Sequence, residues 1–246
     1  MAAEYFIGTS GYVYPHWKEV FYPKDLPQKD WLPYFAERLD TVEINNTFYQ
    51  MPEPEKVRNW ASQVPEDFCF VMKMNRIVTH RKRLIDMERM VGDFVRAVDT
   101  AADALGPILV QLPPRWKANP ERLNEFLDYC PGGYRYAVEF RDADWLRDEV
   151  YRVLEDHNAA VVIHDLIEDH PHVTPADWTY LRFHGPTESG NYAHDYSPQF
   201  LSARADEIAD HLNSGKDVYV YFNNDVGGNA VRNALDLKRY VEDRQS

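Results

Sequence analysis

Hydrophobic and polar residues alternate along several short stretches of this chain, most clearly in Thr41–Tyr49 (TVEINNTFY). Val42 and Ile44 form one face of an extended segment. The opposite face holds Glu43 and Asn45, because successive side chains of a strand point to opposite sides. Helix-like amphipathic runs precede and follow this segment, as expected for a central strand of an α/β sheet. Central parallel strands are normally apolar on both faces, so the polar face marks a candidate functional element.

The same kind of pattern predicts eight strands separated by helices. Strands are expected at Tyr5–Ser10, Thr41–Tyr49, Phe68–Asn75, Ile108–Leu112, Tyr134–Arg141, Ala159–Asp165, Trp178–His184 and Asp217–Asn223. Helices are expected at Trp31–Leu39 with Asp30 as its cap, Pro54–Val64, Leu84–Leu105, Pro120–Tyr129, Trp145–Asp156, Pro198–Asn213 and Asn229–Val241. Two loops complete the pattern: Asp169–Asp177, which is too short for a full helix, and the polar segment Gly185–Ser197.

This alternation predicts a single-domain TIM (β/α)₈ barrel over residues 1–246, with some helices degenerate. A doubly wound sheet is the alternative. The barrel explains the polar strand faces better, because one face of each barrel strand points into the lumen. Residues at the C-terminal ends of the strands then reach the mouth, where barrel enzymes carry their active sites.

The segment between the first strand and the first helix is rich in aromatic residues, including Tyr12, Tyr14, Trp17, Phe21 and Tyr22. Large rings in a loop either pack over the barrel or line a binding cleft, and packing is the more common outcome. Tyr12 and Trp17 are retained as candidate ligand contacts.

Composition narrows the cellular context. The net charge of −13 disfavours broad binding to nucleic acid or to an anionic membrane, although a local basic cleft is compatible with it. No apolar run approaches the ~20 residues that a membrane helix needs. The N-terminal MAAEYFIGTSG has no basic segment before an apolar one, so no secretory signal is expected. Cys69 and Cys130 are the two cysteines, which favours a cytoplasmic protein without a disulfide framework.

Several motifs together resemble a known family. They are IGTSGYVYPHW, FYPKDLP, TVEINNTFY, FVMKMNRIVTH, VQLPP, VEFRDADW, YLRFHG and YVYFNND, and they extend from the first strand to the last. The chain resembles the domain-of-unknown-function 72 family, also called YecE-like, in which a Trp is expected where this chain has Tyr12. The resemblance implies a TIM barrel and leaves the activity open.

Polar residues recur near the C-terminal end of nearly every predicted strand, and we expect them to converge at the barrel mouth. Candidate catalytic residues are Glu43, Glu139, Asp165 and His184. Candidate substrate-binding residues are Asn45, Lys73, His80, Gln111, Arg141, Arg182 and Asn223, together with Tyr12 and Trp17. The alternative is that some of them form buried ion pairs that hold the barrel centre, for instance Glu139 with Arg182 or Glu43 with Lys73.

Three chemistries are compatible with these residues. Acid–base catalysis on an anionic or polyol substrate needs a carboxylate, a histidine and cationic anchors. Metal-assisted hydrolysis needs clustered ligands, which His80, Glu139, His164, Asp165 and His184 can supply, yet neither an H-x-H nor an H-E-x-x-H spacing is present. Glycoside hydrolysis needs two facing carboxylates, and Glu43 and Glu139 are the candidates.

The sequence therefore predicts an enzyme, hydrolase or lyase in type, that acts on a small or locally anionic polar substrate. A divalent metal is the candidate cofactor, although the residues that could ligate it show neither of those two spacings. The alternative is a binding module that holds a phosphorylated ligand or a nucleic-acid end without turnover. Metal with His and carboxylate ligands in the mouth favours the first, whereas an anion on Lys73, Arg141 and Arg182 favours anion binding.

Overall fold

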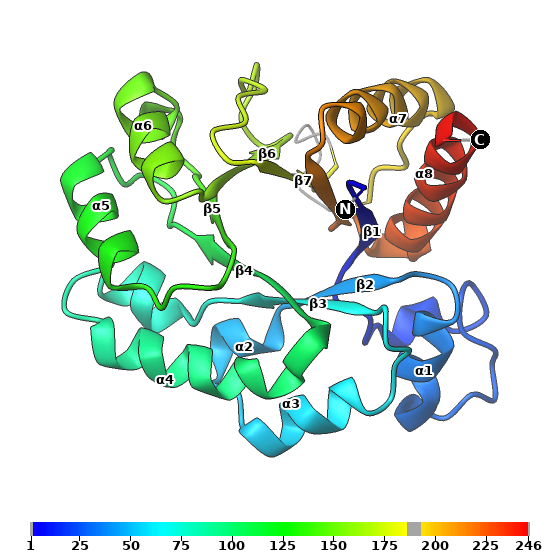
Figure 1. The fold of residues 1–246 in the computed structure, drawn as a ribbon. Helices are drawn as coiled ribbons and strands as arrows, with labels where there is room; N and C mark the ends of the chain where they lie inside the picture. Colours follow the sequence, from blue (N-terminus) through cyan, green and yellow to red (C-terminus); the bar gives the residue numbers. More distant parts are fainter. Residues whose placement is uncertain (1, 186–192, 246) are drawn as a thin grey trace.

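Eight parallel strands close into a barrel, each paired with the next along the chain and the last paired with the first (Figure 1). This computed structural model describes residues 2–185 and 193–245. The strands are β1 (Tyr5–Ser10), β2 (Thr41–Ile44), β3 (Cys69–Lys73), β4 (Leu105–Gln111), β5 (Tyr136–Glu139), β6 (Ala160–His164), β7 (Trp178–Phe183) and β8 (Asp217–Phe222). The predicted TIM barrel is confirmed.

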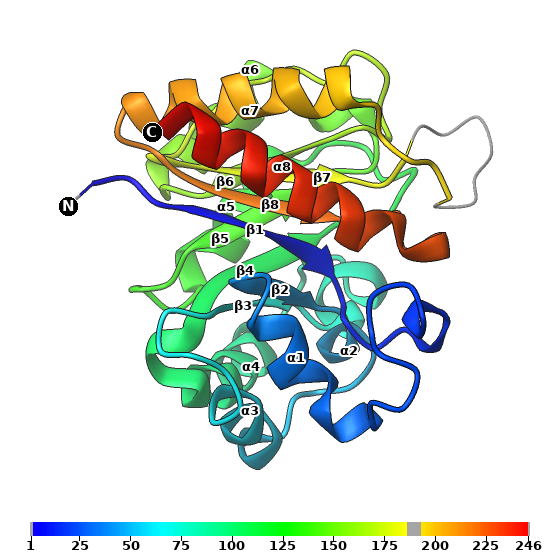
Figure 2. The ribbon, with the colours of Figure 1, turned by 90° about the vertical axis from the view of Figure 1, so that its right-hand side faces the viewer.

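Helices surround the barrel, and each except the short turn at Asn46–Tyr49 lies where the sequence pattern predicts a helix. They are α1 (Trp31–Ala36), α2 (Asn46–Tyr49), α3 (Pro54–Ala61), α4 (Glu88–Val98), α5 (Pro120–Tyr129), α6 (Asp148–Asp156), α7 (Pro198–Asn213) and α8 (Asn229–Gln245). Residues 165–177, between β6 and β7, contain no helix, in agreement with the predicted loop. In Figure 2 both chain ends lie on the left, whereas α2 lies on the right, at the end toward which β1 points.

Two hydrophobic clusters hold the barrel together. The inner cluster fills the lumen and consists of Phe6, Cys69, Val71, Leu109, Ala137, Ala160, Val162, Ala176, Trp178, Tyr180, Tyr219 and Tyr221. Alternate strand residues, such as Val42 and Leu181, belong to a larger cluster that also includes Phe94 of α4 and Leu237 of α8. This alternation follows from the pleat of the strands and confirms that one strand face points into the lumen.

Register brings the polar strand ends to one level of the barrel. Ser10 is paired with Glu43, Gln111 with Glu139, and His164 with Arg182. The lumen therefore changes from apolar to charged at the C-terminal ends of the strands.

The predicted strand Thr41–Tyr49 is wrong in its second half. The strand ends at Ile44, and residues 46–49 form the single helical turn α2. The hydroxyl of Thr47 lies 2.6 Å from the carbonyl oxygen of Lys73 and 3.0 Å from that of Ile44, so it stabilises the turn rather than a strand face. Local side-chain bonds of this kind compete with strand pairing.

The predicted helix Leu84–Leu105 is also wrong at both ends. Arg83, Leu84 and Asp86 have positive φ angles, so α4 begins only at Glu88. After Val98 the chain continues as a 3₁₀ helix, and at Ala102 φ is 52° and ψ is −130°, which is not helical. Leu105 already belongs to β4. Tertiary context overrides the helix propensity of the alanine-rich segment here.

Two smaller expectations have different outcomes. Asp30 precedes α1 but its side chain makes no capping hydrogen bond, because a 3₁₀ turn at Gln28–Asp30 runs directly into the helix. The predicted loop Gly185–Ser197 includes residues 186–192, which lie outside the described residues.

Within the described ranges, no helix has both the length and the apolar character needed to cross a membrane.

Candidate functional site

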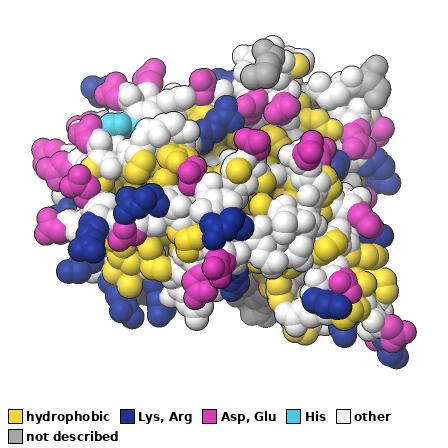
Figure 3. Space-filling view, turned by 60° about the horizontal axis from the view of Figure 1, so that its bottom comes forward, with side chains coloured by type: hydrophobic (Ala, Val, Ile, Leu, Met, Phe, Trp, Pro, Cys, Tyr) yellow, Lys and Arg dark blue, Asp and Glu magenta, His cyan; other side chains and the backbone are white. Residues whose placement is uncertain are grey.

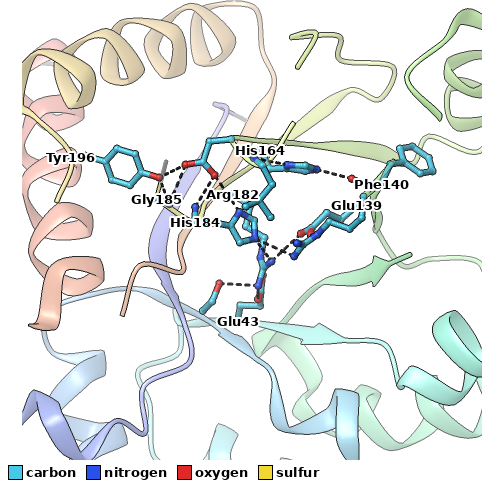
Figure 4. Close-up of polar contacts among 12 residues, drawn as sticks. Glu43, Glu139, Phe140, His164, Arg182, His184, Gly185 and Tyr196 are labelled. Atoms are coloured by element: carbon cyan, nitrogen blue, oxygen red, sulfur yellow. Dashed lines mark hydrogen bonds and ion pairs between the residues drawn. The ribbon is translucent and has the colours of Figure 1, made fainter. Parts of the chain in front are cut away.

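A buried guanidinium group links opposite sides of the barrel at the charged level. Arg182 on β7 is 1% exposed, and Glu43 on β2 and Glu139 on β5 are fully buried. The Nε and Nη2 atoms of Arg182 donate to the two carboxylate oxygens of Glu43 at 3.0 and 2.7 Å. Nη1 donates to Oε2 of Glu139 at 3.0 Å (Figure 4). One arginine therefore pairs with two carboxylates, and Arg141 forms a second ion pair with Glu139.

These ion pairs keep both carboxylates charged. Burial alone would raise the pKa of Glu139, but the charges of Arg141 and Arg182 outweigh it and hold that pKa well below its ordinary value. The pKa of Glu43 is lowered in the same sense, because Arg182 and Lys73 outweigh the cost of burial. Tyr180 also donates to Glu43 at 2.8 Å. Neither carboxylate is suited to give up a proton near neutral pH.

The predicted alternative, in which buried ion pairs hold the barrel centre, therefore applies to Arg182, Glu43 and Glu139, with one correction. The pair between Glu139 and Arg182 is present, whereas Glu43 pairs with Arg182 and makes no ion pair with Lys73 among the described residues. The predicted catalytic residues Glu43 and Glu139 lie beneath the surface of the mouth. Together with Arg141 and Arg182 they form the bottom of the mouth, which we call the floor.

His184 and Asp165 form a second hydrogen-bonded unit beside Arg182. Arg182 Nη1 donates to Nε2 of His184 at 2.7 Å, and a guanidinium group cannot accept, so the ring proton lies on Nδ1. Nδ1 is 3.3 Å from Oδ1 of Asp165. Asp165 also accepts from the backbone N–H groups of His184 and Gly185 and from the Tyr196 hydroxyl. Burial, followed by the charge of Arg182, lowers the pKa of His184 to about 4, so the ring is neutral at pH 7.

An open pocket of about 770 Å³ lies above this floor at the C-terminal end of the barrel. Seven of the predicted residues line it: Asn45, Lys73, His80, Gln111, Arg141, Arg182 and Asn223. Six further residues line it that the sequence analysis did not select: Tyr14, Phe48, Tyr49, Arg76, Arg81 and Asp225. The basic run from Arg76 to Arg83, directly after the third predicted strand, was the available signal for Arg76 and Arg81.

Tyr12 and Trp17 do not line this pocket. Tyr12 lines a neighbouring hollow with Trp60. Trp17 is fully buried and donates from Nε1 to the backbone oxygen of Asp225 at 2.8 Å, so it supports the wall from behind. The aromatic loop packs over the barrel at Trp17 and Tyr22, while Tyr14 reaches the pocket.

Short helical turns after β2 and β3 carry much of the pocket wall. Asn75 connects them, since its amide donates to the Thr47 oxygen at 3.1 Å and its Oδ1 accepts from Ile77 N–H at 3.0 Å. Residues Ile77–Arg81 form one turn of π-helix, a rare geometry that is frequent at functional sites. The Phe48 ring, carried by α2, lies 5.0 Å from the ring of His80.

The pocket concentrates positive charge. Its lining includes five cationic side chains, those of Lys73, Arg76, Arg81, Arg141 and Arg182, and one carboxylate, that of Asp225. Lys73, Arg76 and Arg81 make no ion pair within the part of the chain that the structure describes. On the face shown in Figure 3, by contrast, basic and acidic side chains are interspersed.

The two ends of the barrel differ in charge. A hollow of about 520 Å³ at the N-terminal ends of the strands is bordered by acidic side chains, namely Glu4, Asp40, Glu66, Asp67 and Asp103. The net charge of −13 is therefore unevenly distributed, and the mouth is a cationic site on an acidic protein.

The predicted metal ligands do not form a ligand cluster. Across residues 2–185 and 193–245, no three His, Cys, Asp or Glu side chains are grouped so that they could hold a metal ion. His164 donates from Nε2 to the Phe140 oxygen at 2.7 Å and accepts the Leu166 N–H at Nδ1, so both of its nitrogens are engaged.

Fold and site together define a class: a (β/α)₈-barrel protein with a cationic pocket at the C-terminal mouth. The chain belongs to the family described as "Protein of unknown function DUF72", which matches residues 6–246. The family resemblance inferred from the motifs is thereby confirmed.

Relatives support this assignment. The UPF0759 protein YecE of Escherichia coli (strain K12) is 33% identical over 110 residues, which are 44% of this chain and only 40% of that protein. The UPF0759 protein YunF of Bacillus subtilis (strain 168) is 25% identical, with 96% of this chain and 94% of that protein covered. A DUF72 family protein from Thermotoga maritima has a TM-score of 0.88 at 30% identity, covering 97% of this chain and 99% of that one. These relatives share the family, and no activity follows from them.

Removal of one floor carboxylate should destabilise the protein. We expect Glu139→Ala to lower the free energy of unfolding by about 3–5 kcal/mol, because buried Arg182 loses one of its two counterions. Urea denaturation measures this cost, with Glu125→Ala on the exposed face of α5 as the matched control. A near-neutral Glu139→Ala would contradict the structural role of the ion pairs.

The buried neutral His184 should make stability pH-dependent. The unfolded chain binds a proton on this imidazole below about pH 6.5, whereas the folded chain binds it only near its pKa of about 4. Stability is therefore lost as the pH falls from 6.5 towards 4. His184→Gln should reduce the difference in unfolding free energy between pH 7 and pH 4 by roughly 2–3 kcal/mol. Equal pH slopes for the two proteins would refute this origin of the acid sensitivity.

Proposed function

We propose that the mouth pocket binds a small polar ligand through a phosphate or carboxylate group, and that the protein is an enzyme of hydrolase or lyase type acting on it. The observation that carries the proposal is the convergence of five cationic side chains in one open pocket of a strongly acidic protein. Arg141 and Arg182 are paired with the buried carboxylates, whereas Lys73, Arg76 and Arg81 make no ion pair among the described residues. Arginine presents a planar fork that suits bidentate contacts to oxyanions, and lysine adds a point charge.

Groups for proton transfer border the same pocket. Burial, followed by the charge of Lys73, lowers the pKa of His80 to about 4, so its imidazole is available as a neutral acceptor at pH 7. Burial raises the pKa of Asp225, which favours a carboxyl group that retains its proton to higher pH than usual. An imidazole and a carboxyl group in the lining of one anion pocket are groups that acid–base catalysis uses.

Location at the C-terminal mouth supports an enzyme by analogy, because characterised barrel enzymes carry their active sites there. A cytoplasmic setting is part of the proposal and agrees with the free thiols of Cys69 and Cys130.

The alternative, a module that holds a phosphorylated ligand or a nucleic-acid end without turnover, has one specific observation in its favour. Tyr49 is 63% exposed beside the pocket, and the guanidinium carbon of Arg76 lies 5.4 Å from its ring centroid. An exposed ring beside a cation suits base stacking.

Anion binding should depend on the pocket cations that are not part of the floor. Calorimetric titration with inorganic phosphate, ribose 5-phosphate and a short single-stranded oligonucleotide tests this. We expect Arg76→Gln combined with Arg81→Gln to weaken binding at least about tenfold, which corresponds to ~1.4 kcal/mol. Arg182→Ala is less suitable because it also removes the floor.

The control is Arg96→Gln on α4 combined with Arg239→Gln on α8, which removes the same total charge from two exposed side chains that do not line the pocket. Tighter binding of the oligonucleotide than of both small phosphates would favour the binding module. No binding of any ligand by wild type, or equal weakening in the control, would remove the anion site.

A further inference from the structure

Lys73 differs from the other unpaired pocket cations, Arg76 and Arg81, because it is buried. It lies at the C-terminal end of β3 and is 8% exposed, yet its amine lines the pocket. No hydrogen bond or ion pair to this amine occurs within residues 2–185 and 193–245. The centroid of the Phe48 ring lies 4.8 Å from Nζ. Arg182 takes the carboxylate of Glu43 that would otherwise be available to the lysine.

Resting on the proposed function, we propose that Lys73 is a nucleophile that forms an imine with a small aldehyde or ketone carrying a phosphate or carboxylate group. Arg76 and Arg81 hold the anionic group, and the carbonyl carbon lies against the lysine amine. Substrates of this class combine a carbonyl with an anionic group. The pocket offers Lys73 for the carbonyl and the two arginines for the anionic group.

The charge environment keeps part of this amine neutral. Burial, followed by the charge of Arg182, lowers the pKa of Lys73 to about 8, while Glu43 and Glu139 oppose this and Arg141 adds to it. At pH 7 roughly a tenth of the amine is then unprotonated, compared with less than about one part in a thousand for a lysine of ordinary pKa. Desolvation beside other cations is a known way to activate a lysine for imine formation.

The reaction is a condensation that releases water. The Nζ lone pair attacks the carbonyl carbon, a C–N bond forms, and the proton lost from nitrogen is taken up by the carbonyl oxygen to give a carbinolamine. A second proton on that oxygen allows water to leave, and the product is a protonated imine. Neutral His80 and the carboxyl group of Asp225, both in the pocket lining, can relay these protons.

Pyridoxal 5′-phosphate serves as the probe because it carries an aldehyde and a phosphate. The wild-type protein is incubated with it at pH 7 and reduced with borohydride, which converts the imine into a stable secondary amine. Peptide mass mapping then compares Lys73 with Lys29, an exposed lysine that does not line the pocket. We expect Lys73 to be modified at least about tenfold faster.

Three further experiments test whether the adduct forms in the pocket. Pyridoxine 5′-phosphate, which has the phosphate but no aldehyde, should bind and protect Lys73 without protecting Lys29. The Arg76→Gln, Arg81→Gln variant should slow modification of Lys73 alone. Lys73→Arg should abolish the pocket adduct while retaining measurable binding of pyridoxine 5′-phosphate, which shows that the variant is folded.

The outcomes separate this inference from the proposed function. If pyridoxine 5′-phosphate binds but Lys73 reacts no faster than Lys29, the imine is refuted and the anion pocket stands. If Lys73 reacts quickly but neither the competitor nor the arginine changes affect it, the proposed geometry is refuted. If the competitor does not bind and Lys73 is unmodified, both proposals fail.

Discussion

The mouth of this barrel depends on a single buried arginine that is shared by two carboxylates from opposite sides of the lumen. Bringing Arg182, Glu43 and Glu139 out of water costs several kcal/mol for each charge, and their attraction offsets this only with good hydrogen-bond geometry. The bidentate contact to Glu43 and the single contact to Glu139 provide that geometry. The strands β2, β5 and β7 are thereby tied at one level, and a charged floor replaces the apolar filling of the lower barrel.

The floor also determines what the pocket above can do. Arg182 forms an ion pair with Glu43, and Arg141 and Arg182 both form ion pairs with Glu139. These carboxylates are therefore unavailable for proton transfer or for an ion pair with Lys73. The histidine next to the floor is held neutral, with its Nε2 accepting from Arg182 and its Nδ1 directed to Asp165. The candidate reactive groups therefore lie above the floor: Lys73 at the end of β3, His80 on the π-helical turn and Asp225 on the loop after β8. Arg76 and Arg81, which line the same pocket, make no ion pair within the part of the chain that the structure describes.

Much of the fold was predictable from the chain because the signals were local and repeated. Strand faces with period two, alternating with amphipathic helices, specify a barrel, and the strands were predicted within a few residues at most positions. The failures occurred where a few side-chain hydrogen bonds or positive φ angles interrupted a regular pattern. Thr47 ends β2 by bonding to two carbonyl groups, and Leu84 cannot begin a helix at a φ of 68°.

The sequence by itself determined the barrel, the family and part of the set of polar residues at the mouth, since each of these follows from periodicity or from motifs along the chain. The tertiary structure alone decided which of those residues are buried counterions and which line the open pocket. Glu139 and Lys73 look alike in the sequence, as single charges on apolar strands. Their difference arises from one guanidinium group donated by a strand more than 40 residues further along the chain than Glu139. Pairing across a barrel depends on register and closure, which no local pattern encodes.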